Sequence, residues 1–208
     1  HKFQHIYALP LYSLLTFSWI VWGDYFSMIR YEKKGIVKQV GGHTLKEASI
    51  MIFSKAIYLF MHFVLPIFIL GFVWWHVVLG FVLMHMVSGF ILSIVFQLAH
   101  VVEGPEYPVP DNDGNIENNW AVHQLHTTAN FAKSRKLLSW FIGGLNYQIE
   151  HHLFPNISHI HYPKISKIVE NTANEFQLPY YEFHTFRSAV MSHLRQLKRL
   201  GQNPKLAQ

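Results

Sequence analysis

The residues best suited to chemistry stand in one short run, NYQIEHHLFP, at Asn146–Pro155. On a helix, Gln148, His151 and His152 occupy positions i, i+3 and i+4, which share one face. Two imidazoles and an amide oxygen can then converge on one region, and neutral imidazole commonly binds iron, copper, zinc and nickel. The spacing therefore predicts a metal site near a helix end. The alternative is a surface histidine pair without a ligand role.

Two further histidine pairs lie in the same half of the chain. His123 and His126 are three positions apart, so a helix places them on one face. They are candidates either for metal ligands or for hydrogen bonds to a neighbouring loop. His159 and His161 alternate along the chain, and we expect them to hold metal-binding histidines in place by hydrogen bonds, with direct ligation as the alternative.

The composition indicates what kind of protein surrounds these candidates. Half of the 208 residues are hydrophobic and only 14% are charged, whereas soluble domains carry about 25% charged residues. The chain holds no cysteine, which excludes disulfides, thiolate zinc sites, iron–sulfur clusters and cysteine nucleophiles. A formal charge of +5 indicates an anionic partner such as lipid, acyl-CoA or an acidic protein. We expect no nucleic-acid partner, because no nucleic-acid-binding motif accompanies the basic tail at Arg187–Lys205.

Two long apolar runs, Ile50–Phe72 and Val77–Leu98, are the elements that must position the candidates. Each exceeds the 18 or so apolar residues that indicate a membrane-spanning helix. Trp74 and Trp75 stand between them, as in the aromatic belt at a membrane surface. The alternative is a pair of buried helices in a soluble protein, but the remaining residues are too few to cover runs of this length. We therefore expect a transmembrane helical hairpin.

The basic residues predict how the hairpin is oriented. The link between the two runs carries no Lys or Arg, whereas residues 29–49 and 101–208 carry almost all of them. Because positive loops stay in the cytoplasm, both of these segments are expected on the cytoplasmic side. Residues 11–28 form a third apolar stretch that either crosses the membrane or lies in its interface. Asp24 and Tyr25 favour the interfacial position.

The expected fold is thus an all-α membrane protein with three parts. Residues 1–49 are an interfacial, juxtamembrane segment, residues 50–100 are the hairpin, and residues 101–208 are a helical cytosolic cap with a C-terminal tail. His100 ends the second apolar run, at the point where the cap begins. It therefore lies on the same side as the histidine pair of the first motif, which makes it a further candidate ligand. The alternative is a histidine favoured only by the helix dipole.

The other histidines have less specific surroundings. His62 and His85 fall within the apolar runs, where they either pair across the hairpin, bind haem, or are satisfied by a Ser or backbone oxygen of a neighbouring helix. We expect the last of these. His184 and His193 fall in an amphipathic tail and are expected to be solvated.

The run at Gln148–Pro155 resembles the third histidine box of membrane fatty acid desaturases. Its glutamine in first place is similar to the form in front-end desaturases and bacterial linoleoyl-CoA desaturase-like proteins. Trp120, the run Thr127–Phe131 and the hairpin that ends at His100 are also similar, so the resemblance covers essentially the whole chain. It implies a four-span helical membrane enzyme whose cytosolic cap holds two iron ions among histidines.

The resemblance also implies a ligand set. His100, His151 and His152 would be iron ligands, while Gln148 takes the place of a histidine and either ligates weakly, bonds a water or does not ligate. The family has two earlier histidine boxes, of HxxxH and HxxHH type, and neither occurs in this sequence. We therefore expect the sequence to be the C-terminal part of a desaturase, inactive alone, with two spans and two boxes upstream.

The activity that this resemblance implies is the O2-dependent insertion of a cis double bond into a fatty acyl chain. The substrate would be an acyl-CoA or a lipid-linked acyl group, and the electrons would come from an external donor of the ferredoxin or cytochrome b5 type. A related di-iron hydroxylase is one alternative, since similar histidine boxes serve that reaction. A non-redox membrane protein whose histidines bind zinc or protons is the other.

Overall fold

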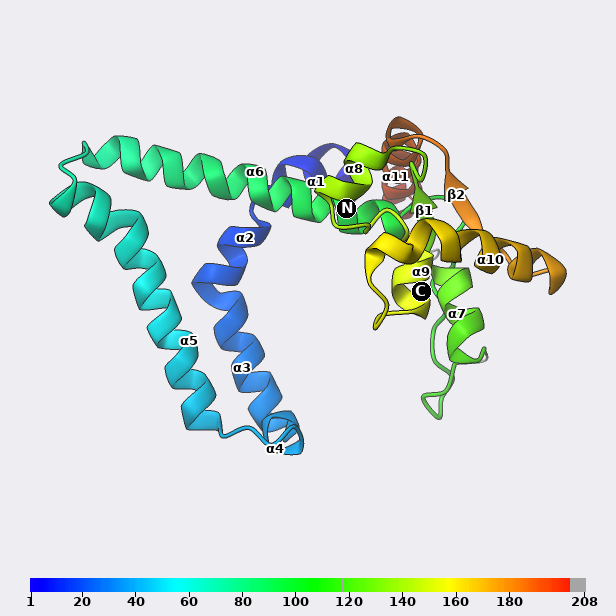
Figure 1. Cartoon of the computed structure of the whole chain (residues 1–208), viewed down its shortest axis with the longest axis horizontal. Coiled ribbons are helices and arrows are strands. Elements are labelled where there is room, and N and C mark those ends of the chain that lie inside the picture. Colours follow the sequence, from blue (N-terminus) through cyan, green and yellow to red (C-terminus); the bar gives the residue numbers. More distant parts are fainter. Residues whose placement is uncertain (117, 203–208) are drawn as a thin grey trace. The chain divides into compact units, whose positions relative to one another are not determined.

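The computed structural model of the chain describes residues 1–116 and 118–202. It is mostly helical, which confirms the expected fold class, although the two three-residue strands in the described residues were not predicted. The order of the elements can be followed in Figure 1. They are α1 (Gln4–Tyr12), α2 (Leu15–Ser18), the π-helix η1 (Trp19–Gly23), α3 (Asp24–Lys33), α4 (Ile36–Gln39), α5 (Thr44–Leu59), the π-helix η2 (Phe60–Ile69), α6 (Trp74–His100), α7 (Trp120–Thr127), β1 (Ala129–Phe131), α8 (Lys136–Phe141), α9 (Gln148–Leu153), the 3-10 helix η3 (His159–His161), α10 (Tyr162–Glu175), β2 (Tyr181–Phe183) and α11 (Phe186–Gln202).

Two helices of the described chain are long and apolar enough to cross a membrane, Thr44–Ile69 and Trp74–His100. This agrees with the two apolar runs of the sequence. Pro66 lies inside the first helix, where it removes a backbone N–H and favours the wider π-helical turns of η2. A third span is counted only if α1 and Leu15–Lys33, which are bent relative to each other, are taken as one. The choice between a crossing and an interfacial position for residues 11–28 thus stays a prediction.

Contacts within the chain define two compact units. The first unit contains His1–Leu9 and Ser93–Gln208, and the second contains Pro10–Leu92. Helix α6 contributes to both, and its last turns belong to the unit that carries the histidine box. The division at residues 49 and 100 concerns position in the membrane, which these contacts do not address, so it remains a prediction.

The second unit satisfies its mid-span histidines with oxygen atoms. His85 is 6% exposed; its Nε2 lies 2.7 Å from the Tyr58 hydroxyl and its Nδ1 lies 3.0 Å from Oγ1 of Thr16. His62 donates from Nδ1 to the backbone oxygen of Tyr58 over 2.8 Å. Both histidines are thus held by oxygen atoms, as expected, but the partners differ from the expected Ser or backbone oxygen of a neighbouring helix. His85 bonds hydroxyls of Tyr and Thr, and His62 bonds a backbone oxygen of its own helix, four residues earlier. Lys55 is similarly paired, with its Nζ 2.8 Å from Oδ2 of Asp24.

The core of the first unit forms where α7, α9 and α10 meet. Leu125, Ile149, Val169 and Ala173 are buried together there. The strands β1 and β2 pair in parallel, with Asn130 in register with Glu182. The apolar core and the strand pair together fix the short helix α9, which carries the histidine box.

Candidate metal centre

Helix α9 is a short helix whose two faces differ. It begins at Gln148 and ends at Leu153, two positions before Pro155, which cannot continue a helix. Ile149 points into the core and is fully buried. Gln148 and His152 meet on another face, with Nε2 of the amide 3.3 Å from Nε2 of the imidazole. The rings of His151 and His152 lie 5.9 Å apart between centroids. The structure therefore groups the three polar side chains as their spacing predicted.

His100 joins this group from the end of α6. Its ring lies 5.1 Å from that of His152, measured between centroids, in an edge-on arrangement. The structure thus brings three imidazoles together from segments about 50 residues apart, all within the first unit. Rings at such separations can share a metal, because metal–nitrogen bonds are about 2.1 Å long.

Two hydrogen bonds to α7 determine which nitrogen of each ring carries the lone pair. Nδ1 of His152 lies 2.7 Å from Oε1 of Gln124, and Nδ1 of His100 lies 3.4 Å from the backbone oxygen of Thr127. Since both oxygens can only accept, each Nδ1 must donate its hydrogen. In the neutral rings the lone pairs then reside on Nε2, the atom left for a metal.

His151 is held from a different element. Its Nδ1 lies 3.3 Å from the hydroxyl of Tyr162 at the start of α10. That tyrosine is only 3% exposed, so its hydroxyl is fixed in place. His159 and His161, which we expected to hold metal-binding histidines, are exposed in the preceding 3-10 helix. The contact to the box therefore comes from the residue next to this pair.

The surroundings of His152 favour its neutral form. Burial, and then the nearby imidazoles of His100 and His151, lower the pKa of His152 to about 4. Both causes act in the same direction, since burial and like charges disfavour the protonated ring. At physiological pH this imidazole is therefore unprotonated, which is the state that binds a metal.

Gln148 contributes an unsatisfied polar atom to the same site. The residue is 2% exposed, and its Oε1 is buried with no hydrogen-bond partner among the described residues. A buried carbonyl oxygen without a partner costs free energy, so an oxygen in this position beside imidazoles fits contact with a cation or a water. The donor set is rich in nitrogen and fits iron or another first-row transition metal. In the described part of the chain, no three His, Cys, Asp or Glu side chains enclose a metal ion by themselves.

The remaining histidines are distributed as follows. The carbonyl of His126 accepts a hydrogen bond from the Glu106 amide over 2.8 Å, and its Nδ1 lies 3.1 Å from Oε1 of Glu106, so this residue contacts a neighbouring loop as expected. The expectation does not hold for His123, whose buried Nδ1 has no hydrogen-bond partner among the described residues. His184 is exposed over 89% of its side chain, as predicted.

The prediction for His193 was wrong. This residue is fully buried, and its Nδ1 donates to the backbone oxygen of Val101 over 2.6 Å. The reason is the inner face of α11, which buries residues at i, i+3, i+4, i+7 and i+8 even though several are polar, namely Ala189, Ser192, His193, Gln196 and Leu197. A polar side chain on such a face is buried when a backbone carbonyl can satisfy it.

Sequence reasoning also missed Gln124 and Tyr162 as partners of the box. Gln124 lies between His123 and His126, and only these two histidines of the segment were predicted to contact other residues. Gln124 lies one helical turn before Thr127, so the two residues share one face of α7. That spacing was the available signal that both could contact the histidine cluster. Tyr162 carried no comparable signal in the sequence.

The fold and the site together define a class, that of helical membrane proteins with a cluster of imidazoles suited to a transition metal. Comparison with known proteins makes this specific: residues 1–184 match the fatty acid desaturase family, and the chain belongs to it. Members of this family generally contain two iron ions and act on fatty acyl lipids with O2.

Three relatives illustrate the similarity. An sn-1 linoleoyl-lipid 6-desaturase from Synechocystis sp. is 37% identical over 97% of this chain and 55% of its own length. An acyl-lipid (8-3)-desaturase from Physcomitrium patens is 38% identical over 97% and 41%, respectively. The Delta(5) fatty acid desaturase A of Dictyostelium discoideum is 32% identical over 98% and 44%. The chain thus spans about half the length of the curated relatives that it matches. No solved structure matches it significantly.

Proposed function

We propose that this chain forms part of a fatty acyl desaturase and supplies one share of the ligands of its two iron ions. The observation that carries the proposal is the convergence of His100 and His152, whose Nδ1 atoms donate to α7, which leaves the lone pairs of both rings on Nε2. The Nε2 of His152 accepts a long contact of 3.3 Å from the Gln148 amide nitrogen, which a metal ion would replace. Family membership supports iron as the metal. A histidine with a purely structural role needs neither a second imidazole beside it nor an acceptor that orients its ring.

Within this proposal each side chain has a separate task. His100 and His152 would bind through Nε2, and His151 would bind on the same face of α9. Gln148 would present its buried Oε1 to the ion or to a water beside it. Gln124 and Tyr162 would hold the rings in the required orientation, as the outer partners of metal-binding histidines generally do.

The iron ions, when bound, supply the strong oxidant that unactivated methylene groups require, with O2 and two electrons as co-reactants. The chain holds the metal-binding side chains in place and excludes water from the site. Burial keeps His152 unprotonated, and the fully buried core residue Ile149 closes the side of α9 away from the site. A substrate chain held rigidly beside these residues would lose little of its binding energy to reorganisation.

We infer that the acyl group is attached to a lipid or to CoA and that the histidines face the cytoplasm. The names of two relatives, linoleoyl-lipid and acyl-lipid desaturases, favour the lipid-linked form. The net positive charge of the chain suits an anionic headgroup or an acidic electron donor of the ferredoxin or cytochrome b5 type.

The test is product analysis in a host that makes linoleoyl lipids, with the protein expressed as its own organism makes it. We expect a new double bond without inserted oxygen, detected by gas chromatography and mass spectrometry of the acyl chains. An alcohol would instead identify a hydroxylase. A purified protein that carries zinc or no transition metal and leaves the lipids unchanged would contradict the proposal.

A further inference from the structure

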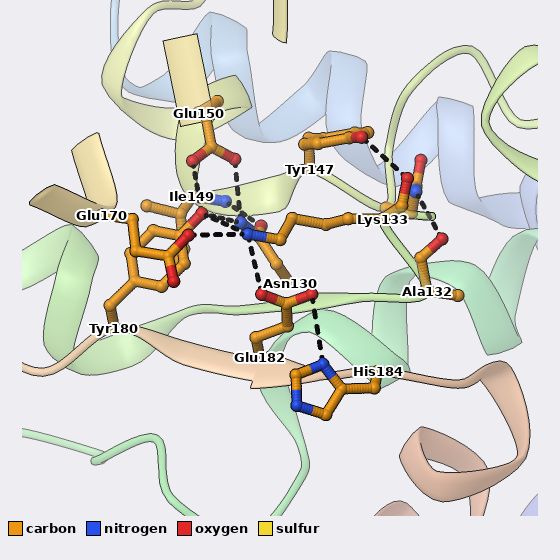
Figure 2. Close-up of polar contacts among 11 residues, drawn as sticks. Asn130, Ala132, Lys133, Tyr147, Ile149, Glu150, Glu170, Tyr180, Glu182 and His184 are labelled. Atoms are coloured by element: carbon orange, nitrogen blue, oxygen red, sulfur yellow. Dashed lines mark hydrogen bonds and ion pairs between the residues drawn. The ribbon is translucent and has the colours of Figure 1, made fainter. Parts of the chain in front are cut away.

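Glu150 lies within the histidine box but belongs to a different site. Successive helical residues are about 100° apart, so Glu150 points away from the face that carries Gln148, His151 and His152. The residue is fully buried. Figure 2 shows its two carboxyl oxygens directed toward Asn130 and Tyr180. A carboxylate is a common iron ligand, but this one is already engaged on the opposite side of the helix.

Asn130 holds both the side chain and the backbone of α9. Its Nδ2 donates to Oε2 of Glu150 over 2.9 Å, and its Oδ1 accepts the backbone N–H of Ile149 over 3.0 Å. The N–H groups of the first turn of a helix have no partner within the helix, so this side chain caps α9 from the strand β1. Asn130 is itself fully buried.

Tyr180 and Lys133 extend the network behind the helix. The Tyr180 hydroxyl donates to Oε1 of Glu150 over 2.8 Å and accepts from Nδ2 of Asn130 over 2.8 Å. Lys133 places its Nζ 3.3 Å from the same hydroxyl, 2.7 Å from Glu182 and 3.2 Å from Glu170. Figure 2 shows these side chains gathered around the lysine nitrogen.

The backbone closes the same arrangement. The amide of Phe131 donates to the carbonyl of Asn146 over 3.0 Å, and the amide of Ala132 donates to the carbonyl of Phe183 over 2.7 Å. The end of β1 and the residue that follows it thus join the residues just before α9 to β2. Three distant stretches of chain are fixed to one another behind the histidine box.

We propose that the cluster of Asn130, Glu150 and Tyr180 positions the metal-binding face of α9, so that its side chains meet His100 in one fixed orientation. The inference rests on the proposed iron site. A buried polar cluster is weak evidence for stability, because apolar side chains of similar volume often stabilise as well or better. The six-residue helix α9 is too short to be stable alone. Directional bonds to both oxygens of Glu150 and to the Ile149 amide fix its rotation about its axis and its position along that axis.

The test compares Tyr180→Phe and Glu150→Gln with Ser192→Ala in the intact protein. Each of the first two changes removes a hydrogen bond of the cluster while keeping the shape of the side chain. Ser192 is equally buried, and its Oγ accepts a hydrogen bond from the amide of Glu103, away from α9. The measurements are the iron bound per polypeptide, the rate at which a chelator removes it, and the melting temperature of the metal-free protein.

We expect both cluster variants to lose iron to the chelator at least about ten times faster than the wild type, the range seen for outer-shell changes. Ser192→Ala should melt at a lower temperature yet release iron at the wild-type rate. If all three variants released iron alike, the positioning role would be refuted while the iron site stood. If the wild type bound no iron, the proposed function would fail and this inference with it. Should Glu150→Gln not fold, Tyr180→Phe decides the outcome.

Discussion

His85 in the second compact unit and His152 in the first are both withdrawn from solvent, His85 fully and His152 in part, and the two residues are used differently. His85 in the second unit has a hydroxyl group at each ring nitrogen, 2.7 Å from Tyr58 and 3.0 Å from Thr16. His152 in the first unit has a short bond only at Nδ1, to Gln124. Its Nε2 has a 3.3 Å contact with the Gln148 amide and faces an imidazole from α6.

The number of close hydrogen-bond partners at the ring nitrogens distinguishes a structural histidine from a candidate metal ligand. A buried imidazole with two close oxygen partners is fully satisfied, so removing it costs stability only. An imidazole with one strong bond, a lowered pKa and other imidazoles nearby keeps a basic nitrogen at a point where donors converge. The less buried of the two, His152, is the one that keeps a basic nitrogen, so the number of close oxygen partners and not the degree of burial distinguishes the two cases.

The largest expected effect is that of His152→Ala in the intact protein. Loss of a ligand should remove iron and lower product formation by more than about 100-fold, beyond the range of outer-shell changes. Metal analysis and acyl-chain analysis of the same preparation measure both. His184→Ala is the control, because that side chain is 89% exposed, and it should change neither. Equal losses in the two variants would show that the sorting of histidines is wrong.

A smaller effect is expected for Gln124→Leu. This change removes the oxygen that orients His152, so the affinity for iron should fall by about 10- to 100-fold. Gln124→Glu keeps an acceptor in the same place and should retain most of the affinity. Competition with a chelator of known affinity gives the values. Unchanged iron binding in the leucine variant would remove Gln124 from the site.

His85→Phe tests the other side of the comparison. The change leaves the Tyr58 hydroxyl without its partner, which should cost about 1–2 kcal/mol of stability. Thermal unfolding in detergent measures the loss. The iron content per folded polypeptide should stay at the wild-type level. A variant that melted normally but lost iron would make His85 part of the metal site and break the distinction.

The smallest effect concerns His193, whose pKa is lowered by burial. The unfolded chain takes up a proton near pH 6.5, whereas in the folded chain this ring takes up its proton only at a lower pH. The unfolded state therefore binds more protons, and the free energy of unfolding falls as the pH decreases through 6.5. From pH 7.0 to pH 6.0 the loss is at most about 0.7 kcal/mol.

His193→Gln retains a donor for the Val101 carbonyl but cannot take up a proton. Unfolding of the metal-free wild type and variant at both pH values isolates the contribution of this residue. The wild type should lose more stability than the variant between the two pH values. Parallel losses would mean that His193 is not the group that titrates.

Much of this architecture could be predicted from local pattern. The spans followed from the length of the apolar runs, and the shared face of Gln148, His151 and His152 followed from helical spacing. His100 followed from its place at the end of a span. Each of these predictions depends on residues near one another in the sequence, where periodicity carries the information.

The outer partners of the site could not be predicted in this way. Gln124, Tyr162 and Asn130 bond residues of α9 that are 11 to 28 positions away in the sequence, and no local rule relates such positions. The strands β1 and β2 are only three residues long, too short for an alternating pattern. His193 was misjudged because amphipathicity was judged from residue type, while a buried carbonyl satisfied the ring.

The pairing of β1 with β2 has a consequence for biosynthesis. The strand that completes the support of α9 begins at Tyr181, about 30 residues after His152. At roughly 5–20 residues per second, the histidine box leaves the ribosome seconds before the segment that locks it. During that interval the imidazoles are not yet aligned, so under the proposed function the iron site would be complete only once β2 has docked.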